Sequence, residues 1–180
     1  FGRDLIFGDE GADYIRGEQY SFYLGSSGVI NPANLGHVFN DTIYGGGGAD
    51  TIDGGLGDDF IDGGDGDDRL DGGPGADTIY GGTGNDTVYG EGSDSVDLGA
   101  GDDTFYYTRT DGNAFAVVRG GEGADYFYIY SDTHSTDRLV IDLSETTPAK
   151  DVVALSYYGS PAMPLEIVGF DLSLDKLDLP

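Results

Sequence analysis

The chain has 180 residues and no cysteine, and its 34 acidic and 8 basic side chains give a net charge of -26. Disulfide cross-links are therefore excluded, and this much negative charge argues against nucleic acid or anionic lipid as a partner. Apolar runs stay well short of the roughly 18 residues that a membrane-spanning helix needs, so we expect no membrane span.

The N-terminal residues 3–16 contain one and a half copies of a nine-residue pattern. Asp4 and Asp13 are nine residues apart, and Ile6 and Ile15 follow them at the same offset. The next segment, 17–39, interrupts the pattern and is rich in aromatic and aliphatic residues. Such a segment is long for a loop in a compact domain. We expect it to pack over the neighbouring repeats as a lid or N-terminal cap; an aromatic surface for a partner or a glycan is the alternative.

Residues 45–89 form five head-to-tail copies of the pattern Gly-Gly-x-Gly-x-Asp-x-U-x, where U is a large apolar residue, and 120–128 form a sixth. Glycine permits left-handed and crowded backbone conformations, so each six-residue turn can aim several carbonyl groups inward. The last three residues of each copy predict a short strand whose position 8 points inward and whose positions 7 and 9 point outward. The predicted inward residues are Ile43, Ile52, Ile61, Leu70, Ile79 and Val88.

Position 6 is aspartate in every copy. The shortened copy 90–97 brings Asp94 one residue early, Asp103 restores the step of nine within 98–106, and Asp137 with Leu139 is a final degenerate copy. Carboxylate and carbonyl oxygens are the ligands that Ca²⁺ prefers, and it takes six to eight of them. The fixed period and this spelling together predict an all-β fold, a right-handed parallel β-roll that binds several calcium ions. A disordered chain, which the composition alone favours, has no reason to keep this register.

These repeats resemble the RTX, or hemolysin-type calcium-binding, nonapeptide repeats of bacterial proteins, over about residues 1–140. The resemblance implies a flattened roll whose turns alternate between two edges, with ions between turns two repeats apart. One row of ions would use the turns of Asp41, Asp59, Asp77 and Asp94, and the other those of Asp50, Asp68, Asp86 and Asp103. The shortened copy departs from the pattern, so an ion beside Asp94 is left open.

The resemblance also implies which oxygens hold the ions. The carboxylate ligands would come from Asp13, Asp41, Asp50, Asp59, Asp68, Asp77, Asp86, Asp94, Asp103 and Asp125. The carbonyl ligands, at positions 2 and 4, would come from Gly46, Gly48, Gly55, Gly57, Gly64, Gly66, Gly73, Gly75, Gly82, Gly84, Gly99, Gly101, Gly121 and Gly123.

The composition shifts after the repeats, and we therefore divide the chain into two parts. Residues 1–143 are the predicted roll, interrupted by insertions at 17–39 and 107–119, and residues 144–180 are a β-rich C-terminal cap. Val153, Leu155 and Tyr157 alternate as one strand of this cap. A solenoid needs such a cap, because otherwise its apolar ladder would face water. Phe1 lies inside a repeat, so we expect the chain to be a piece of a longer protein.

No set of residues predicts catalysis, and we expect no enzyme. His37 and His134 are isolated, and the H-E-x-x-H motif of zinc proteases is missing. The acidic run at Asp65, Asp67 and Asp68 lacks the twelfth-position Glu and the flanking helices of an EF-hand. Outward-facing tyrosines at position 9 form either a binding surface or packing pairs. These are Tyr44, Tyr80, Tyr89, Tyr106 and Tyr128.

The predicted function is a calcium-binding module that folds when it binds Ca²⁺. Its apolar core is thin for so large a net charge, so metal binding must supply much of the folding free energy. The resemblance implies a secreted, extracellular location after type I secretion, within a larger exoprotein. Its partners would be calcium and other parts of that exoprotein or further copies of the chain. The alternatives are a structural or adhesive segment of a cell-surface or surface-layer protein, and an accessory module of a polysaccharide-modifying enzyme.

Overall fold

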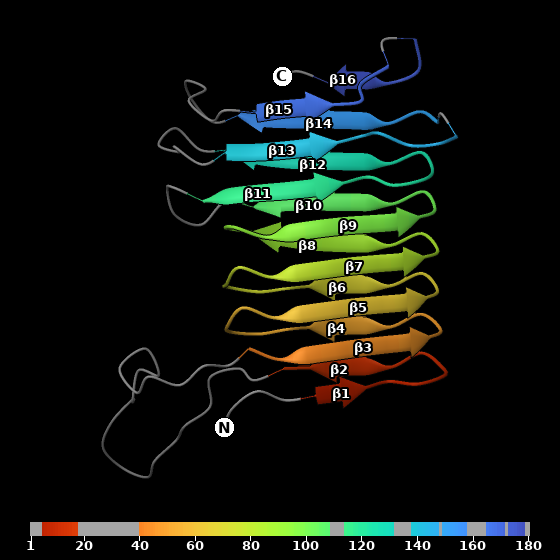
Figure 1. Ribbon diagram of the computed structural model, residues 1–180, viewed down its shortest axis with the longest axis vertical. Helices are drawn as coiled ribbons and strands as arrows, with labels where there is room; N and C mark the ends of the chain where they lie inside the picture. Colours follow the sequence, from red (N-terminus) through yellow and green to blue (C-terminus); the bar gives the residue numbers. More distant parts are fainter. Residues whose placement is uncertain are drawn as a thin grey trace.

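The chain is wound into a β-solenoid in which successive strands alternate between two sheets (Figure 1). The computed structural model describes residues 5–17, 40–108, 114–131, 138–147, 149–157, 165–171 and 173–178. One sheet contains β1 (Leu5–Phe7), β3 (Thr42–Gly47), β5 (Phe60–Asp65), β7 (Thr78–Thr83), β9 (Ser95–Ala100), β11 (Phe115–Arg119), β13 (Arg138–Asp142) and β15 (Leu165–Val168). The other contains β2 (Tyr14–Arg16), β4 (Thr51–Asp53), β6 (Arg69–Asp71), β8 (Thr87–Glu91), β10 (Thr104–Thr108), β12 (Tyr126–Ser131), β14 (Val152–Tyr157) and β16 (Lys176–Asp178).

Every strand pairs in parallel with the strand two places along the chain. In the first sheet, Ile43 of β3 lies opposite Ile61 of β5, which lies opposite Ile79 of β7. In the second sheet, Ile52 of β4 lies opposite Leu70 of β6. The nine-residue period therefore equals half of one coil, and this arrangement confirms the predicted parallel β-roll.

The core is a ladder of apolar side chains between the two sheets. All six predicted inward residues, from Ile43 to Val88, are buried, with at most 1% of their surface exposed. The ladder continues with Val96, Phe105, Val118, Phe127, Ile141 and Val153. Along the glycine repeats each strand thus contributes a single large side chain to the interior, which is a narrow core.

The core becomes thicker toward the C-terminus. The register aligns Gly90 with Tyr107, Tyr107 with Ile129, and Ile129 with Leu155. A position that is glycine in the regular repeats is therefore filled by a large buried side chain in β10, β12 and β14. The strands β10, β12 and β14 each bury two large residues and depend less on their turns for cohesion.

The structure corrects two expectations about the C-terminal half. Residues 107–119 are not simply an insertion, because Tyr107 belongs to β10 and Phe115–Arg119 forms β11, which pairs with β9 and β13. The strand was missed because it lacks a Gly-Gly turn before it. Leu139 is buried, but it does not occupy position 8 of a last repeat. Ile141, which is aligned with Val118, occupies that position. The predicted partner Asp137 lies outside the described residues.

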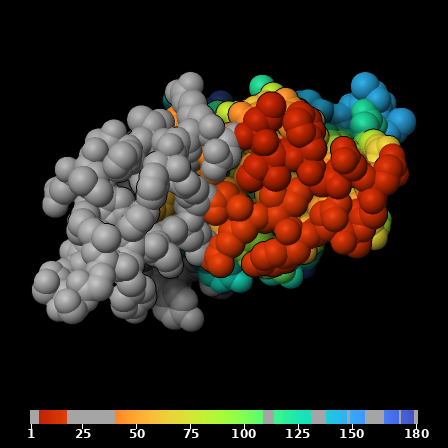
Figure 2. Space-filling view, turned by 90° about the horizontal axis from the view of Figure 1, so that it is seen from below, coloured from red at the N-terminus to blue at the C-terminus, as the bar shows by residue number. Residues whose placement is uncertain are grey.

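The predicted cap continues both sheets of the roll. β14 pairs with β12, β15 pairs with β13, and β16 pairs with β14, all in parallel. At the opposite end, Figure 2 shows the red coil of β1 and β2, where Leu5, Phe7 and Tyr14 are 60–71% exposed. The predicted lid over 17–39 lies outside the described residues apart from Gly17.

The outward tyrosines pack on one another across the strands. The rings of Tyr89 and Tyr106 are 5.0 Å apart and those of Tyr106 and Tyr128 are 4.8 Å apart, both stacked. The guanidinium of Arg69 lies 4.0 Å from the centre of the Tyr89 ring. On the other sheet Tyr44 and Tyr80 flank Phe60 with tilted rings, whose centres are 5.8 and 5.6 Å from that of Phe60. Of the two alternatives, these residues therefore form packing pairs.

Gly64 and Gly66, at positions 2 and 4 of one copy, are required by both conformation and space. Gly64 has φ of 103°, and a Cβ built on it would lie 2.1 Å from the carbonyl oxygen of Gly46 in the preceding coil. Gly66 has φ of 135°, and its Cβ would lie 1.8 Å from the oxygen of Gly48. Successive turns therefore stack backbone on backbone, and a side chain at these positions would separate them.

We predict that Gly64→Ala destabilises the calcium-loaded roll by about 1–3 kcal/mol, because alanine there must adopt a positive φ. Gly47→Ala is the matched control, since Gly47 has no positive φ and its Cβ would meet only the flexible side chain of Glu10. It should change the free energy of unfolding by less than about 0.5 kcal/mol. Urea unfolding followed by circular dichroism measures both, and equal effects of the two substitutions would contradict the stacking argument.

Candidate metal centres

The turns of the solenoid lie in two columns, one along each edge. We call the column that leads from odd-numbered to even-numbered strands the first edge, and the other column the second edge; they lie at the right and left of Figure 1. The structure places Asp50, Asp68, Asp86 and Asp103 on the first edge and Asp41, Asp59, Asp77 and Asp94 on the second. This is the division into two rows that the sequence predicts.

Each aspartate of the first edge is bonded to its neighbour in the next coil. The backbone N–H of Asp50 donates to Oδ1 of Asp68 at 2.8 Å, and the N–H of Asp68 donates to Oδ1 of Asp86 at 2.8 Å. The same bond joins every successive pair in the row Asp13, Asp50, Asp68, Asp86, Asp103, Asp125, Asp151 and Asp175. One carboxylate oxygen of each residue thus holds two coils together.

The second edge has a shorter row of the same kind. The N–H of Asp41 donates to Oδ1 of Asp59, that of Asp59 to Asp77, and that of Asp77 to Asp94, at 2.7–2.9 Å. Beyond Asp94 the register places Ala116 and then Leu139 at the equivalent position. The second edge therefore loses its aspartates where the core becomes thicker.

The other carboxylate oxygen is the notable feature of these rows. Oδ2 is buried and has no hydrogen-bond partner in Asp13, Asp50, Asp59, Asp68, Asp77, Asp86, Asp103 and Asp125. Except for the half-buried Asp13, these residues are at most 3% exposed. A buried carboxylate oxygen without a partner is costly unless a proton or a cation compensates it.

Burial dominates the titration of these carboxyl groups in the metal-free structure. Loss of solvation, partly offset by the N–H bond to Oδ1, raises the pKa of Asp59, Asp68 and Asp86 to about 6. The pKa of Asp103 rises to about 7 and that of Asp77 to about 8, where neighbouring carboxylates add repulsion. The rows thus hold more negative charge at neutral pH than their surroundings accommodate.

Backbone oxygens lie beside these carboxylates. The carbonyl oxygens of Gly46 and Gly48 point toward Gly64 and Gly66 in the next coil, and those of Gly55 and Gly57 point toward Gly73 and Gly75. A Cβ built on Gly63 would lie 2.5 Å from Oδ2 of Asp68, so the unpaired oxygen faces the inside of its own turn. Each pair of turns therefore contains neutral carbonyl oxygens and one uncompensated anionic oxygen, a donor set suited to a hard cation such as Ca²⁺.

The carbonyl groups are essential to this fit. In the described part of the chain, no three or more His, Asp or Glu side chains converge on one point as a metal cluster would. A site built from side chains alone is thus not present among these residues. The turns fit a calcium ion only with the backbone carbonyls of positions 2 and 4 included, and these are the carbonyl ligands that the family resemblance implies.

The shortened turn at 90–94 differs from the others because protein groups satisfy its oxygens. Oδ2 of Asp94 accepts the N–H of Glu91 at 2.8 Å, while Oδ1 accepts the N–H of Asp77. The hydroxyl of Tyr107 donates to the carbonyl of Gly92 at 2.9 Å. The sequence left open whether an ion binds beside Asp94. This turn does not have the unpaired carboxylate oxygen that the regular turns provide.

Sequence reasoning missed Asp151 and Asp175, the last two members of the first-edge row. Asp151 is 2% exposed and accepts the N–H of Asp125 at 2.9 Å. A signal was present, because Val153 and Leu177 each follow an aspartate at the repeat offset. The missing Gly-Gly turns concealed it.

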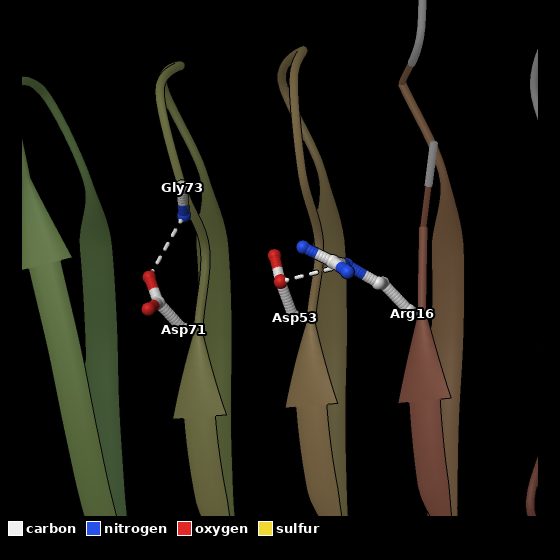
Figure 3. Close-up of polar contacts among 4 residues, drawn as sticks. All are labelled: Arg16, Asp53, Asp71 and Gly73. Carbon is white, nitrogen blue, oxygen red and sulfur yellow. Dashed lines mark hydrogen bonds and ion pairs between the residues drawn. The ribbon is translucent and has the colours of Figure 1, made fainter. Parts of the chain in front are cut away.

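The outward carboxylates at position 9 differ from the buried carboxylates of the two rows, because protein groups pair with them. Figure 3 shows Asp53 paired with Arg16 at 3.1 Å and Asp71 accepting the N–H of Gly73 at 3.2 Å. These groups have partners in the protein and lie outside the two rows. His37 and His134, which we expect to have no catalytic role, lie outside the described residues. Nowhere in the described part of the chain is there a helical segment with the length and apolar character of a bilayer span.

The raised pKa values predict that acid stabilises the metal-free roll. The folded pKa values of about 6 to 8 exceed the ordinary value of 3.8, so protonation contributes stability that is complete below about pH 4. That stability is lost as the pH rises through 6 to 8. In chelator, circular dichroism should show β-structure increasing as the pH is lowered from 8 to 5, whereas saturating Ca²⁺ should flatten the profile above pH 6. A calcium-free signal independent of pH would contradict the role of the buried carboxylates.

Comparison with known proteins agrees with this geometry. The family model of the RTX calcium-binding nonapeptide repeat matches the chain in four copies, at residues 1–19, 36–70, 62–92 and 90–108. No curated protein and no solved structure matches the chain. The matched segments cover just over half of the 180 residues and contain the glycine turns of residues 45–103 and most of both aspartate rows. The chain belongs to the family of proteins that carry RTX calcium-binding nonapeptide repeats.

Proposed function

We propose that this chain is a module of an exported protein that folds only when calcium binds along both edges of the roll. The observation that carries the proposal is the series of buried Oδ2 atoms without a partner, which recurs in eight aspartates of the two rows. A random placement of aspartates would not leave the same oxygen of the same position unpaired in successive coils. We infer that each such oxygen is a calcium ligand, together with the glycine carbonyls beside it.

The energetics support coupling between binding and folding. The unpaired carboxylates oppose folding at neutral pH, and the narrow core of the glycine repeats offers little to offset them. Each Ca²⁺ removes two units of negative charge and connects two coils, so its binding free energy contributes to folding. At a free concentration 100 times Kd, one site stabilises the folded state by about 2.7 kcal/mol.

This coupling suits a protein that folds outside the cell. Extracellular calcium modules bind with Kd of order 10⁻⁴ to 10⁻³ M, so such a chain stays empty where calcium is scarce. We therefore propose that the module remains unfolded before export, in keeping with type I secretion, and folds in the calcium-rich exterior as part of a larger exoprotein. The buried carboxylates are assigned to ion binding and not to acid–base catalysis, because Oδ1 of each is fixed to the neighbouring coil.

A calcium titration tests the proposal directly. In chelator at pH 7.5 we expect a spectrum dominated by disordered chain, and addition of Ca²⁺ to the millimolar range should produce β-structure cooperatively. Magnesium should be a poor substitute, since it demands near-ideal octahedral geometry and releases its water reluctantly. A chain that is fully folded in excess chelator at this pH would overturn the proposal.

Substitution at the centre of the first-edge row should show which aspartates carry the effect. Asp68→Asn removes a buried anionic oxygen and should cost roughly 2–3 kcal/mol of calcium-dependent stability, about the value of one site. Asp67→Asn is the matched control: it changes the same charge, but Asp67 is exposed and only accepts the N–H of Asn85, which an amide oxygen can also do. Calcium midpoints from circular dichroism would contradict the assignment if the two variants shifted them equally.

A further inference from the structure

The side chains at position 5 of the turns form a second, exposed series of hydrogen bonds beside the buried aspartate rows. On the first edge the N–H of Asn85 donates to Oδ1 of Asp67 at 2.8 Å, and the N–H of Asp102 donates to Oδ1 of Asn85 at 2.8 Å. The N–H of Ala124 continues the series to Oδ1 of Asp102 at 3.0 Å. Each of these side chains therefore holds the backbone N–H of its counterpart in the next coil.

The second edge has bonds of the same kind. The N–H of Asp58 donates to Oδ1 of Asn40 at 2.9 Å, and the N–H of Ala76 donates to Oδ1 of Asp58 at 3.1 Å. In the shortened copy, the hydroxyl of Ser93 accepts the N–H of Phe115 at 3.2 Å. Aspartate, asparagine and serine all serve as acceptors, so their shared property is an exposed oxygen and not a negative charge. The direction is also opposite to that of the buried rows, where the earlier coil donates.

Each N–H held on the glycine turns belongs to the peptide group that contains the position 4 carbonyl. A trans peptide is planar, so its C=O and N–H point in opposite directions. The N–H of Asn85 points back to the preceding coil, and the carbonyl of Gly84 accordingly points forward, 1.8 Å from a Cβ built on Gly101. The carbonyl of Gly57 points toward Gly75 in the same way, also at 1.8 Å. The position 5 bond thus fixes the direction of a carbonyl that we assign to calcium.

The shortened turn at 90–94 shows the opposite arrangement. Its position 4 carbonyl, that of Gly92, accepts the hydroxyl of Tyr107 and is therefore already bonded to the protein. The next residue, Ser93, follows Ala76 in the position 5 series, and alanine has no side-chain acceptor for its N–H. In this turn the carbonyl is held by a side chain of the core, and the position 5 bond is missing.

We propose that the position 5 side chains are positioning residues for calcium, each holding a peptide group of the next coil so that its position 4 carbonyl faces the ion. They are Asn40, Asp58, Asp67, Asn85 and Asp102. This inference rests on the proposed function of the roll and adds no ion to it. The side chains act through the backbone and do not touch the metal, which is why an amide serves as well as a carboxylate.

The test uses the full chain, loaded with calcium at pH 7.5, and triple-resonance NMR, which correlates the N–H of Asn85 with the carbonyl carbon of Gly84. Asp67→Ala removes the acceptor of this N–H. We expect the Gly84 carbonyl resonance to move upfield as its coordination is lost, whereas that of Gly101, whose neighbouring N–H is still held by Asn85, stays in place. The calcium midpoint of folding, from circular dichroism, should rise. Asp67→Asn keeps an acceptor oxygen and should restore both values.

Asp65→Ala is the matched control. Asp65 is exposed in the same turn and accepts the hydroxyl of Thr83 at 2.9 Å. Its replacement removes the same charge and a hydrogen bond between the same two coils, but that bond holds no peptide group. The Gly84 resonance should not move. Ala49→Asn is the converse change, because it gives the N–H of Asp67 an acceptor that alanine does not offer, and it should lower the calcium midpoint.

The outcomes separate the positioning role from the proposed function. If calcium does not fold the unmodified chain, the proposed function fails and this inference fails with it. If calcium folds the chain but Asp67→Ala leaves the Gly84 resonance unmoved, only the positioning role is overturned, even where stability falls. Equal movement of that resonance in Asp67→Ala and Asp65→Ala would also overturn it. Movement in Asp67→Ala alone, reversed in Asp67→Asn, supports it.

Discussion

The structure depends on carboxylates that are buried between coils with one oxygen bonded and the other left unpaired. Oδ1 of Asp59 or Asp68 receives a backbone N–H from the preceding coil, which sets the spacing of the turns. Oδ2 then lies inside the turn, out of contact with water and with any donor. A proton or a cation must compensate it. Glycine at positions 2 and 4 keeps the coils close enough for the carboxylates and the carbonyl oxygens of neighbouring turns to lie side by side.

The two edges use this interaction to different extents. The first edge carries aspartate from Asp13 to Asp175, whereas the second edge ends its row at Asp94 and continues with Ala116 and Leu139. At the point of change, Glu91 and Tyr107 supply hydrogen bonds that close the turn. The phenol of Tyr107 also fills the interior beside Phe105. The side chain of Tyr107 thus supplies both a hydrogen bond to the turn and an apolar contact in the core.

The sequence was sufficient to predict the roll and the inward ladder, because Gly and Asp at fixed spacing constrain backbone and ligand together. The two rows were implied by the resemblance to the RTX repeats. The sequence was insufficient to predict strands that are specified by apolar residues alone, without the Gly-Gly and Asp motif. The strand Phe115–Arg119 has Ala116 and Val118 inward but no turn motif, so it was assigned to an insertion. Asp151 was overlooked because its loop has no Gly-Gly turn, and only the packing of two coils reveals its place in the row.

The change in core thickness makes the two ends of the solenoid differ in how much apolar surface each coil buries. In a linear array each coil contacts only its neighbours, so the stability of one coil is passed to the next through their shared interface. The coils of Phe105, Ile129 and Leu155 bury large side chains at two positions per strand, and the regular repeats bury one. The coils that contain these residues therefore depend more on apolar contacts, and less on their turns, than the glycine repeats do.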